Sequence, residues 1–235
     1  MRKVLPILAA AAAGYFFAMY RSGRSGLHPV SRAKEGQVKV ACVGDSITYG
    51  HGTTQWPDNT YPSALRKLLG KDYHVNNFGF NGKTVTPNSA DAYTATKVFT
   101  QSTEYQADIL VFMMGSNDSK PRNWHGAEEF TRDLEALLDC YPGSRCVLCT
   151  PATAFYKEGV SGPLAEFEIQ PEIVHEIATI VRQTAARRDC TLVDIHALTS
   201  DKPHWYISDR IHPSNTGAKA VAQAVAEGIH RSEKQ

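Results

Sequence analysis

The chain has 235 residues, and its 25 lysines and arginines nearly balance its 24 aspartates and glutamates, giving a formal net charge of +1 at pH 7. This balance lacks the clustered basic excess typical of nucleic-acid-binding proteins, so we expect no nucleic-acid partner. Hydrophobic residues make up 42% and charged residues 21%, which is a globular and not a disordered composition. The length suits one α/β domain or two small ones.

The N-terminal segment differs from the rest of the chain. An uncharged run of 17 residues, 4–20, follows Arg2 and Lys3 and is itself followed by Arg21 and Arg24. A membrane-spanning helix needs about 20 apolar residues, and a secretory signal begins with basic residues. We expect residues 1–21 to be a membrane anchor, with a cleaved signal or a first core helix as alternatives. Either of the first two predicts an exported protein, membrane-anchored or secreted (periplasmic).

Residues 22–36 are rich in Ser, Gly and Arg without periodicity, which predicts a linker before a catalytic domain over 37–231 and a polar tail over 232–235. Within the domain, the apolar runs 38–43, 109–114 and 146–150 are continuous, as in parallel strands covered on both faces. Weaker strand candidates lie at 73–78 and 191–195. No internal repeat or second domain is evident, and the oligomeric state stays open.

Four further segments carry apolar residues at the three-and-four spacing of a helix with one buried face. Pro62 opens the first and Gly70 ends it. Strands alternating with helices predict a three-layer, doubly wound α/β/α fold with a parallel five-stranded sheet, in which ligands bind beyond the carboxyl ends of the strands. The four apolar stripes are Leu65, Leu68 and Leu69; Phe130, Leu134, Leu137 and Leu138; Ile173, Val174, Ile177, Ile180 and Val181; and Ala218, Val221, Val225 and Ile229.

Polar residues follow four of the predicted strands. They form Gly44-Asp45-Ser46, "NNFGFNG" at 76–82, "GSND" at 115–118 and "SDRIHP" at 208–213. Each segment alone is equally well explained by a turn, a tight connection or a helix cap. Together they predict one rim of polar residues at the carboxyl edge of the sheet.

This set of segments resembles the four ordered blocks of the SGNH hydrolases, also called GDSL esterases and lipases, over about 38–229. The resemblance implies the flavodoxin-like fold of that family, with Ser46 as the nucleophile and Asp209 and His212 as the Asp-x-x-His pair. It also implies an oxyanion hole made by the backbone N–H groups of Ser46 and Gly79 and the side-chain amide of Asn117.

The chemistry of these side chains agrees with those roles. A serine hydroxyl is a poor nucleophile until a base takes its proton, and an imidazole titrating near pH 6.5 suits that task. Asp209 would fix the tautomer of His212. Asp194 is a weaker candidate for the same role, and Asp45 and Asp118 are interpreted as structural.

No cofactor or metal is expected, because the nine histidines form no paired ligand spacing. The five cysteines predict no disulfide framework. Cys146 and Cys149 match CxxC, but in the body of a predicted strand, where they are interpreted as small buried hydrophobes and not as a redox or metal site.

Loop aromatics give a weak indication of the substrate. Flat rings beside Asn and Asp suit sugar rings, although they would equally serve to cover the core. The overall pattern is similar to carbohydrate (sialate-type) O-acetylesterases, so we predict a small-molecule or carbohydrate acetyl ester as substrate. The alternatives are a membrane-anchored lysophospholipase or thioesterase, an envelope O-acetyltransferase with the same triad, and a non-catalytic binding protein. The candidate substrate-binding aromatics are Trp56, Tyr61, Trp124, Tyr156 and Trp205.

Overall fold

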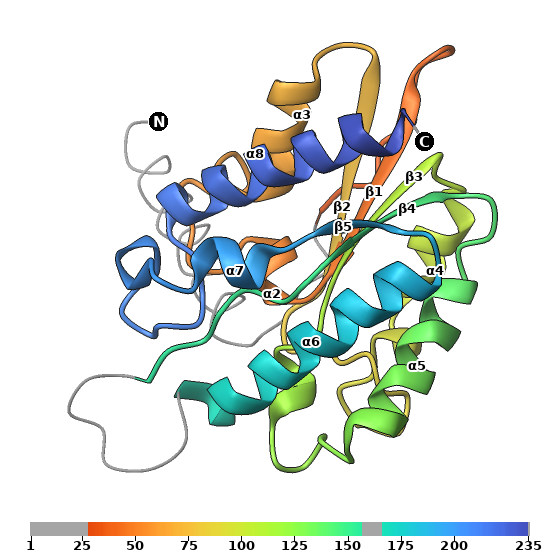
Figure 1. Ribbon diagram of the computed structural model, residues 1–235. Coiled ribbons are helices and arrows are strands. Elements are labelled where there is room, and N and C mark those ends of the chain that lie inside the picture. Colours follow the sequence, from red (N-terminus) through yellow and green to blue (C-terminus); the bar gives the residue numbers. More distant parts are fainter. Residues whose placement is uncertain (1–27, 157–165, 235) are drawn as a thin grey trace, which may run out of the picture.

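The computed structural model describes residues 28–156 and 166–234, so the predicted anchor lies outside the described residues. Five parallel strands form one sheet in the order β2-β1-β3-β4-β5 (Figure 1). The predicted α/β/α doubly wound fold is thereby confirmed. The strands are β1 (Val38–Gly44), β2 (Tyr73–Gly79), β3 (Ile109–Met113), β4 (Arg145–Cys149) and β5 (Thr191–Val193).

Two hydrophobic layers, one on each face of the sheet, make the core. In β1, Val40 and Cys42 belong to one layer and Ala41 and Val43 to the other, because successive side chains of a strand point to opposite faces. This explains why the strand sequences are apolar throughout. Helices α3 (Tyr61–Leu69) and α8 (Asn215–Ser232) cover the first face, and α4 (Lys97–Glu104), α5 (Ala127–Asp139) and α6 (Pro171–Arg187) cover the second (Figure 1).

The predicted helical stripes pack as expected with one exception. Leu65 and Leu69 of α3 are buried, but Leu68 is 51% exposed, because it lies beyond the edge of the stripe that faces α8. Helix α4 was not predicted, since the segment carries few apolar residues and is held mainly by Val98. Its N-terminus is capped by Thr96, whose hydroxyl accepts a hydrogen bond from the N–H of Phe99.

Residues 28–36 of the predicted linker have no helix or strand, but they are fixed to the edge of the sheet. The backbone N–H and C=O of Ser31 both bond to the side-chain amide of Asn76 in β2, at 3.3 and 2.9 Å. The ring of His28 contacts those of Tyr49 and Trp56, with centroids 5.0 and 4.7 Å away. The contact with Asn76 joins this segment to β2, which is an edge strand of the sheet.

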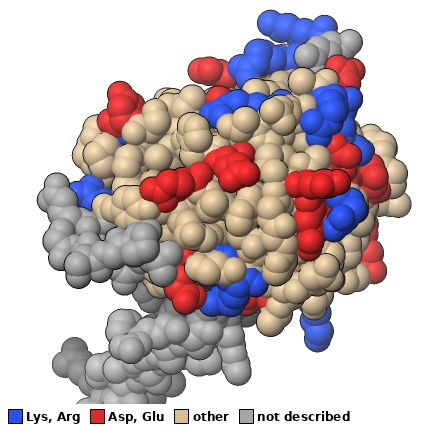
Figure 2. Space-filling view, turned by 60° about the horizontal axis from the view of Figure 1, so that its bottom comes forward, with Lys and Arg blue, Asp and Glu red and all other residues tan. Residues whose placement is uncertain are grey.

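Two properties of the surface bear on partners. Figure 2 shows a face on which acidic and basic side chains are scattered among uncharged ones. Among residues 28–156 and 166–234, no helix combines the length and apolar character that crossing a membrane requires.

Candidate active site

The order of the strands fixes where the site lies. The chain passes from β1 outward to β2, then crosses back to β3 on the other side of β1, so the direction of winding reverses between β1 and β3. Ligands of doubly wound sheets bind beyond the carboxyl ends of the strands at such a reversal. Ser46 follows β1 and Asn117 follows β3, so both stand at this point.

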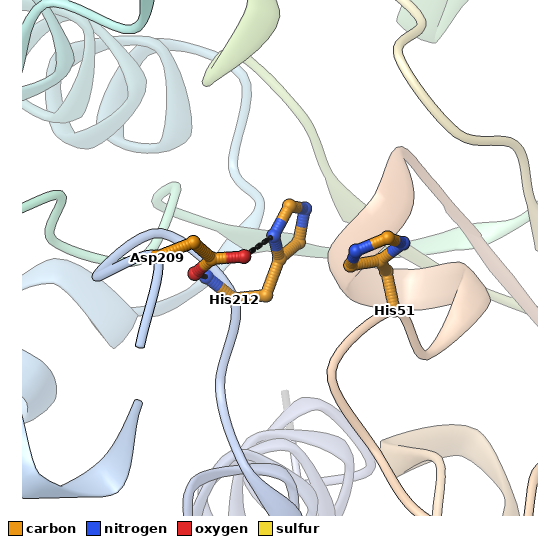
Figure 3. A group of neighbouring side chains, drawn as sticks. All are labelled: His51, Asp209 and His212. Atoms are coloured by element: carbon orange, nitrogen blue, oxygen red, sulfur yellow. Dashed lines mark hydrogen bonds and ion pairs between the residues drawn. The ribbon is translucent and has the colours of Figure 1, made fainter. Parts of the chain in front are cut away.

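Ser46, His212 and Asp209 lie in hydrogen-bond contact in that order. The Oγ of Ser46 is 2.8 Å from Nε2 of His212. On the opposite side of the imidazole, Nδ1 lies 2.7 Å from Oδ2 of Asp209, the contact drawn as a dashed line in Figure 3. With Nδ1 donating to the carboxylate, Nε2 is left to accept the serine proton.

A short backbone turn holds Asp209 against His212. The second carboxylate oxygen of Asp209 accepts the backbone N–H groups of Ile211 and His212, each at 2.9 Å. Asp and Asn commonly organise turns in this way, by bonding to N–H groups two or three residues ahead. Burial by itself raises the pKa of Asp209, but the bonds and charge of His212 together with the backbone N–H bonds outweigh it, so the pKa lies below its ordinary value.

Ser46 is held by its neighbours in the sequence. It is the first residue of the short helix α2 (Ser46–Tyr49), and Asp45 caps that helix by accepting the N–H of Ile47 at 2.9 Å. Gly44 allows a close approach of β1 to β3, because a Cβ at this position would lie 2.6 Å from the carbonyl oxygen of Met113. Asp45 is fully buried, which raises its pKa to about 6, and its structural interpretation agrees with this capping role.

The opposite side of the site depends on contacts between distant segments. The Nδ2 of Asn117 donates to the carbonyl oxygen of Lys83 at 3.2 Å, which leaves its second N–H for another acceptor. The carboxylate of Asp118 accepts the backbone N–H groups of Val85 and Thr86 at 2.9 and 3.0 Å. Through these bonds the turn after β3 fixes the loop after β2. Burial raises the pKa of Asp118 to about 7.

The structure contradicts the prediction that Gly79 supplies an oxyanion donor. Its N–H donates to Oδ1 of Asn77 at 2.8 Å, and the residue is the last of β2. Glycine is needed there for packing, because a Cβ would lie 2.1 Å from the backbone N of Tyr49. The glycine that does line the cavity is Gly82, with φ +75°, and the same block of sequence contains it.

A cavity of about 230 Å³ lies over Ser46 and His212. One wall is polar and formed by the loop after β2 and the turn after β3. The other is apolar and includes Phe167 and Ile169, which precede α6. Seven of the lining residues lie within the four polar segments predicted to form the rim, whereas Ile47, His51, Lys120, Phe167 and Ile169 lie outside them and carry no motif that would single them out. The lining consists of Ser46, Ile47, His51, Asn81, Gly82, Ser116, Asn117, Lys120, Phe167, Ile169, Ile211 and His212.

None of the five predicted substrate-binding aromatics lines this cavity, which corrects the prediction. Tyr61 is 1% exposed within the core, and Trp56 stacks on Tyr49 with its indole N–H bound to the carbonyl of the same residue. Trp124 packs beside Phe130. The hydroxyl of Tyr156 donates a hydrogen bond to Glu172. Trp205 packs against the hydrophobic core. These rings are placed by packing, which residue type and loop position do not reveal.

Asp194, the weaker candidate for the orienting acid, has another role. Its carboxylate pairs with Arg182 at 2.8 and 3.0 Å and caps α7 (Ile195–Thr199) by accepting the N–H of Ala197. Cys146 and Cys149 lie within β4, as predicted.

His51 is the neighbour of His212 that sequence reasoning overlooked. The two imidazole centroids are 4.2 Å apart, and together with Asp209 their ligand atoms lie within 4.8 Å of one another (Figure 3). A metal ion bound by all three would compete with the Asp209–His212 hydrogen bond. Burial, followed by the charge of His212, lowers the pKa of His51 to about 4, so this imidazole is neutral near pH 7.

Comparisons with known proteins show the family and the fold of the chain. The acetylxylan esterase of Xylanibacter ruminicola is 29% identical over 225 residues, covering 86% of this chain, and the chain spans about half (45%) of that relative. A carbohydrate acetylesterase family member from Sinorhizobium meliloti has 25% identity and a TM-score of 0.70, covering 85% of this chain and 100% of that one. The aryl esterase of M. smegmatis shares the fold at 19% identity and a TM-score of 0.64, covering 83% and 99%. The model of the GDSL-like lipase/acylhydrolase family matches residues 42–220. The chain therefore belongs to the GDSL-like lipase/acylhydrolase family, as its sequence predicts.

Proposed function

We propose that this protein is a serine esterase that hydrolyses short-acyl esters, acetyl esters above all, on carbohydrates. The observation that carries the chemistry is the 2.8 Å contact between Ser46 Oγ and His212 Nε2, with Asp209 on the other ring nitrogen. The printed names of the relatives support the substrate class, since one is an acetylxylan esterase and another a carbohydrate acetylesterase family member.

The reaction proceeds in two halves. His212 takes the hydroxyl proton of Ser46 as the oxygen attacks the ester carbonyl, and the resulting imidazolium is stabilised by Asp209. His212 then gives that proton to the leaving sugar hydroxyl, which leaves an acetyl group on Ser46. Water, activated by the same imidazole, releases acetate and restores the serine.

The negative oxygen that forms in each half needs donors. The backbone N–H of Ser46 and the second amide N–H of Asn117 are retained as two of them, and we assign the third to the backbone N–H of Gly82 in place of Gly79. Gly82 lines the cavity, and a Cβ built on it meets nothing within 4 Å, so the backbone there is open to an approaching substrate. Removing one such donor typically costs about 3–4 kcal/mol of transition-state stabilisation.

The size of the cavity favours a small acyl group. Its volume of about 230 Å³ must hold the acyl group and part of the sugar, and the apolar side chains of Ile47, Phe167 and Ile169 approach Ser46 closely enough to line the same space. A long fatty acyl chain would need an extended apolar groove, and the cavity wall opposite is formed by Asn81, Asn117 and other polar groups.

The proposal includes export of the catalytic domain, with residues 1–21 as the anchor or signal. Only the amino-acid pattern supports this part, an uncharged run between basic residues. Separating membrane and soluble fractions of cells expressing the full chain, with a chain beginning at residue 28 as control, tests it. Recovery of both proteins in the cytoplasmic fraction would contradict export.

The decisive experiment compares wild type with Ser46→Ala on p-nitrophenyl esters of two to twelve carbons and on acetylated xylose and xylan oligosaccharides. We expect acetate release from the sugars, rates that fall with acyl length, and a loss of at least about 10⁴-fold in Ser46→Ala at unchanged melting temperature. A preference for long acyl chains would indicate the lysophospholipase or thioesterase alternative. Transfer of acetyl to added sugar, without free acetate, would indicate the acetyltransferase.

A further inference from the structure

Lys120 is a buried cation at the cavity. The residue is only 7% exposed, follows the "GSND" block and lines the same space as Ser46 and His212. Its backbone N–H bonds to the carbonyl of Asn117, which fixes its position relative to the proposed oxyanion donor. Within 28–156 and 166–234, its ammonium makes no hydrogen bond or ion pair. A buried charge without a partner is costly, so such a group normally meets an anion or ordered water.

The acidic side chains around Lys120 are already engaged. Asp91 pairs with Arg122 at 3.1 Å, and Glu168 pairs with the same guanidinium at 2.6 Å. Asp45 is buried beneath the site and bonded to the N–H of Ile47. These three carboxylates act on Lys120 from beyond ion-pair distance. Burial and the charge of Arg122 together lower the pKa of Lys120 more than the carboxylates raise it. Among residues 28–156 and 166–234, no carboxylate forms an ion pair with Lys120, and Lys120 lines the cavity.

We propose that Lys120 binds a carboxylate of the substrate, so that the acetylated sugar, or its immediate neighbour in the glycan, is an acidic sugar such as a uronate. This inference rests on the proposed function and narrows its substrate class. The scissile ester lies over Ser46, and the carboxylate lies at the Lys120 end of the same cavity. The carboxylate does not change charge during ester cleavage, so its contact stabilises ground state and transition state alike and acts on KM.

The test uses one sugar in two forms. Acetylated glucuronic acid and its methyl ester differ only in the charge that Lys120 would meet. We measure kcat and KM on both for wild type, Lys120→Met, which keeps the length without the charge, and Lys120→Arg. Lys219→Met, an exposed lysine of α8 away from the cavity, is the matched control for loss of one charge. Thermal unfolding of each variant monitors folding.

We expect wild type to prefer the acid over the methyl ester by about tenfold to a hundredfold in kcat/KM, mainly through KM, because charge-assisted hydrogen bonds have this strength. Lys120→Met should reduce this acid-to-methyl-ester ratio of kcat/KM to near one. Lys120→Arg should retain part of the preference, and Lys219→Met should have the wild-type ratio. A wild-type ratio of one or below overturns the inference even if Lys120→Met does not fold. So does a preference that survives in folded Lys120→Met.

Failure of this inference is distinguishable from failure of the proposed function. If wild type releases acetate from both sugars in a Ser46-dependent manner but at equal efficiency, the esterase stands and the carboxylate contact is wrong. If wild type cleaves neither sugar and no p-nitrophenyl acetate, the proposed function fails, and this inference fails with it.

Discussion

The two sides of the candidate site are built in different ways. On one side, Asp209 and His212 stand three residues apart in one turn, and Asp209 bonds both the backbone and the imidazole of His212. On the other side, Asn117 reaches Lys83, and Asp118 reaches Val85, across more than 30 positions of sequence. The Asp209–His212 pair is therefore a local arrangement, whereas the donor side is a long-range one.

This difference indicates how each side should respond to mutation. Changing a residue of the Asp209 turn alters the tautomer or charge of His212 directly, with little effect on distant segments. Asn117 and Asp118 bond the turn after β3 to the loop after β2. Replacing a residue that makes these bonds should displace the backbone of that loop, so activity and stability should fall together. The following substitutions test this contrast.

The largest effect is expected from Asp209, and Asp194, the other candidate for the acid that orients His212, is its matched control. Asp209→Asn should lower kcat by about 10⁴-fold. The amide of Asn would donate to Nδ1 of His212, so the imidazole proton would lie on Nε2, and Nε2 could then not accept the hydroxyl proton of Ser46. Asp194→Asn should leave kcat within about twofold while lowering the melting temperature, because it weakens the pairing with Arg182. Steady-state rates and thermal unfolding separate the two. The reverse pattern would make Asp194 the orienting acid.

The next effect concerns the donor amide. Asn117→Ala should lower kcat by about a hundredfold to a thousandfold, with KM little changed, because the amide acts on charge that develops only in the transition state. Asn117→Asp is the matched comparison, since it keeps the size but places an acceptor against the oxyanion, and it should be at least as slow. Unchanged turnover in folded Asn117→Ala would remove this residue from the oxyanion hole.

A smaller effect is expected from the residue that holds the donor loop in place. The carboxylate of Asp118 accepts the backbone N–H groups of Val85 and Thr86. Asp118→Asn replaces one carboxylate oxygen by an NH₂ group, which cannot accept these bonds. We expect the free energy of unfolding to fall by about 1–3 kcal/mol and kcat to fall by about tenfold. Urea unfolding and steady-state kinetics measure both. A change in stability with full activity would mean that the loop after β2 contributes no donor.

The smallest effect is the pH dependence of stability from Asp118. Its pKa is raised by burial from 3.8 to about 7, so the folded protein holds this proton between those pH values while the unfolded chain does not. This contribution to stability is complete below pH 4 and decreases as pH rises to 7. The melting temperature of wild type minus that of Asp118→Asn should therefore decrease from pH 4 to pH 8. A constant difference would contradict the raised pKa of Asp118.

Much of the fold could be predicted because it follows from local periodicity. The continuous apolar runs of β1, β3 and β4 reflect burial on both faces, and the stripes of α5, α6 and α8 reflect burial on one. Leu68 and helix α4 show the limit of this reasoning. The spacing of apolar residues does not show which residue at the margin of a stripe is exposed, and a helix with few apolar residues has no clear periodicity.

The amino-acid sequence by itself determined the five strands, the helices with a strong apolar stripe, the four polar blocks, and the Asp209–His212 pair, because each depends on residues close together in the chain. Only the tertiary structure decided which glycine lines the cavity, that the loop aromatics pack elsewhere, and that Lys120 is buried at the cavity. These outcomes depend on contacts between segments tens of residues apart, and backbone approach and side-chain burial there are set by the packing of the whole domain.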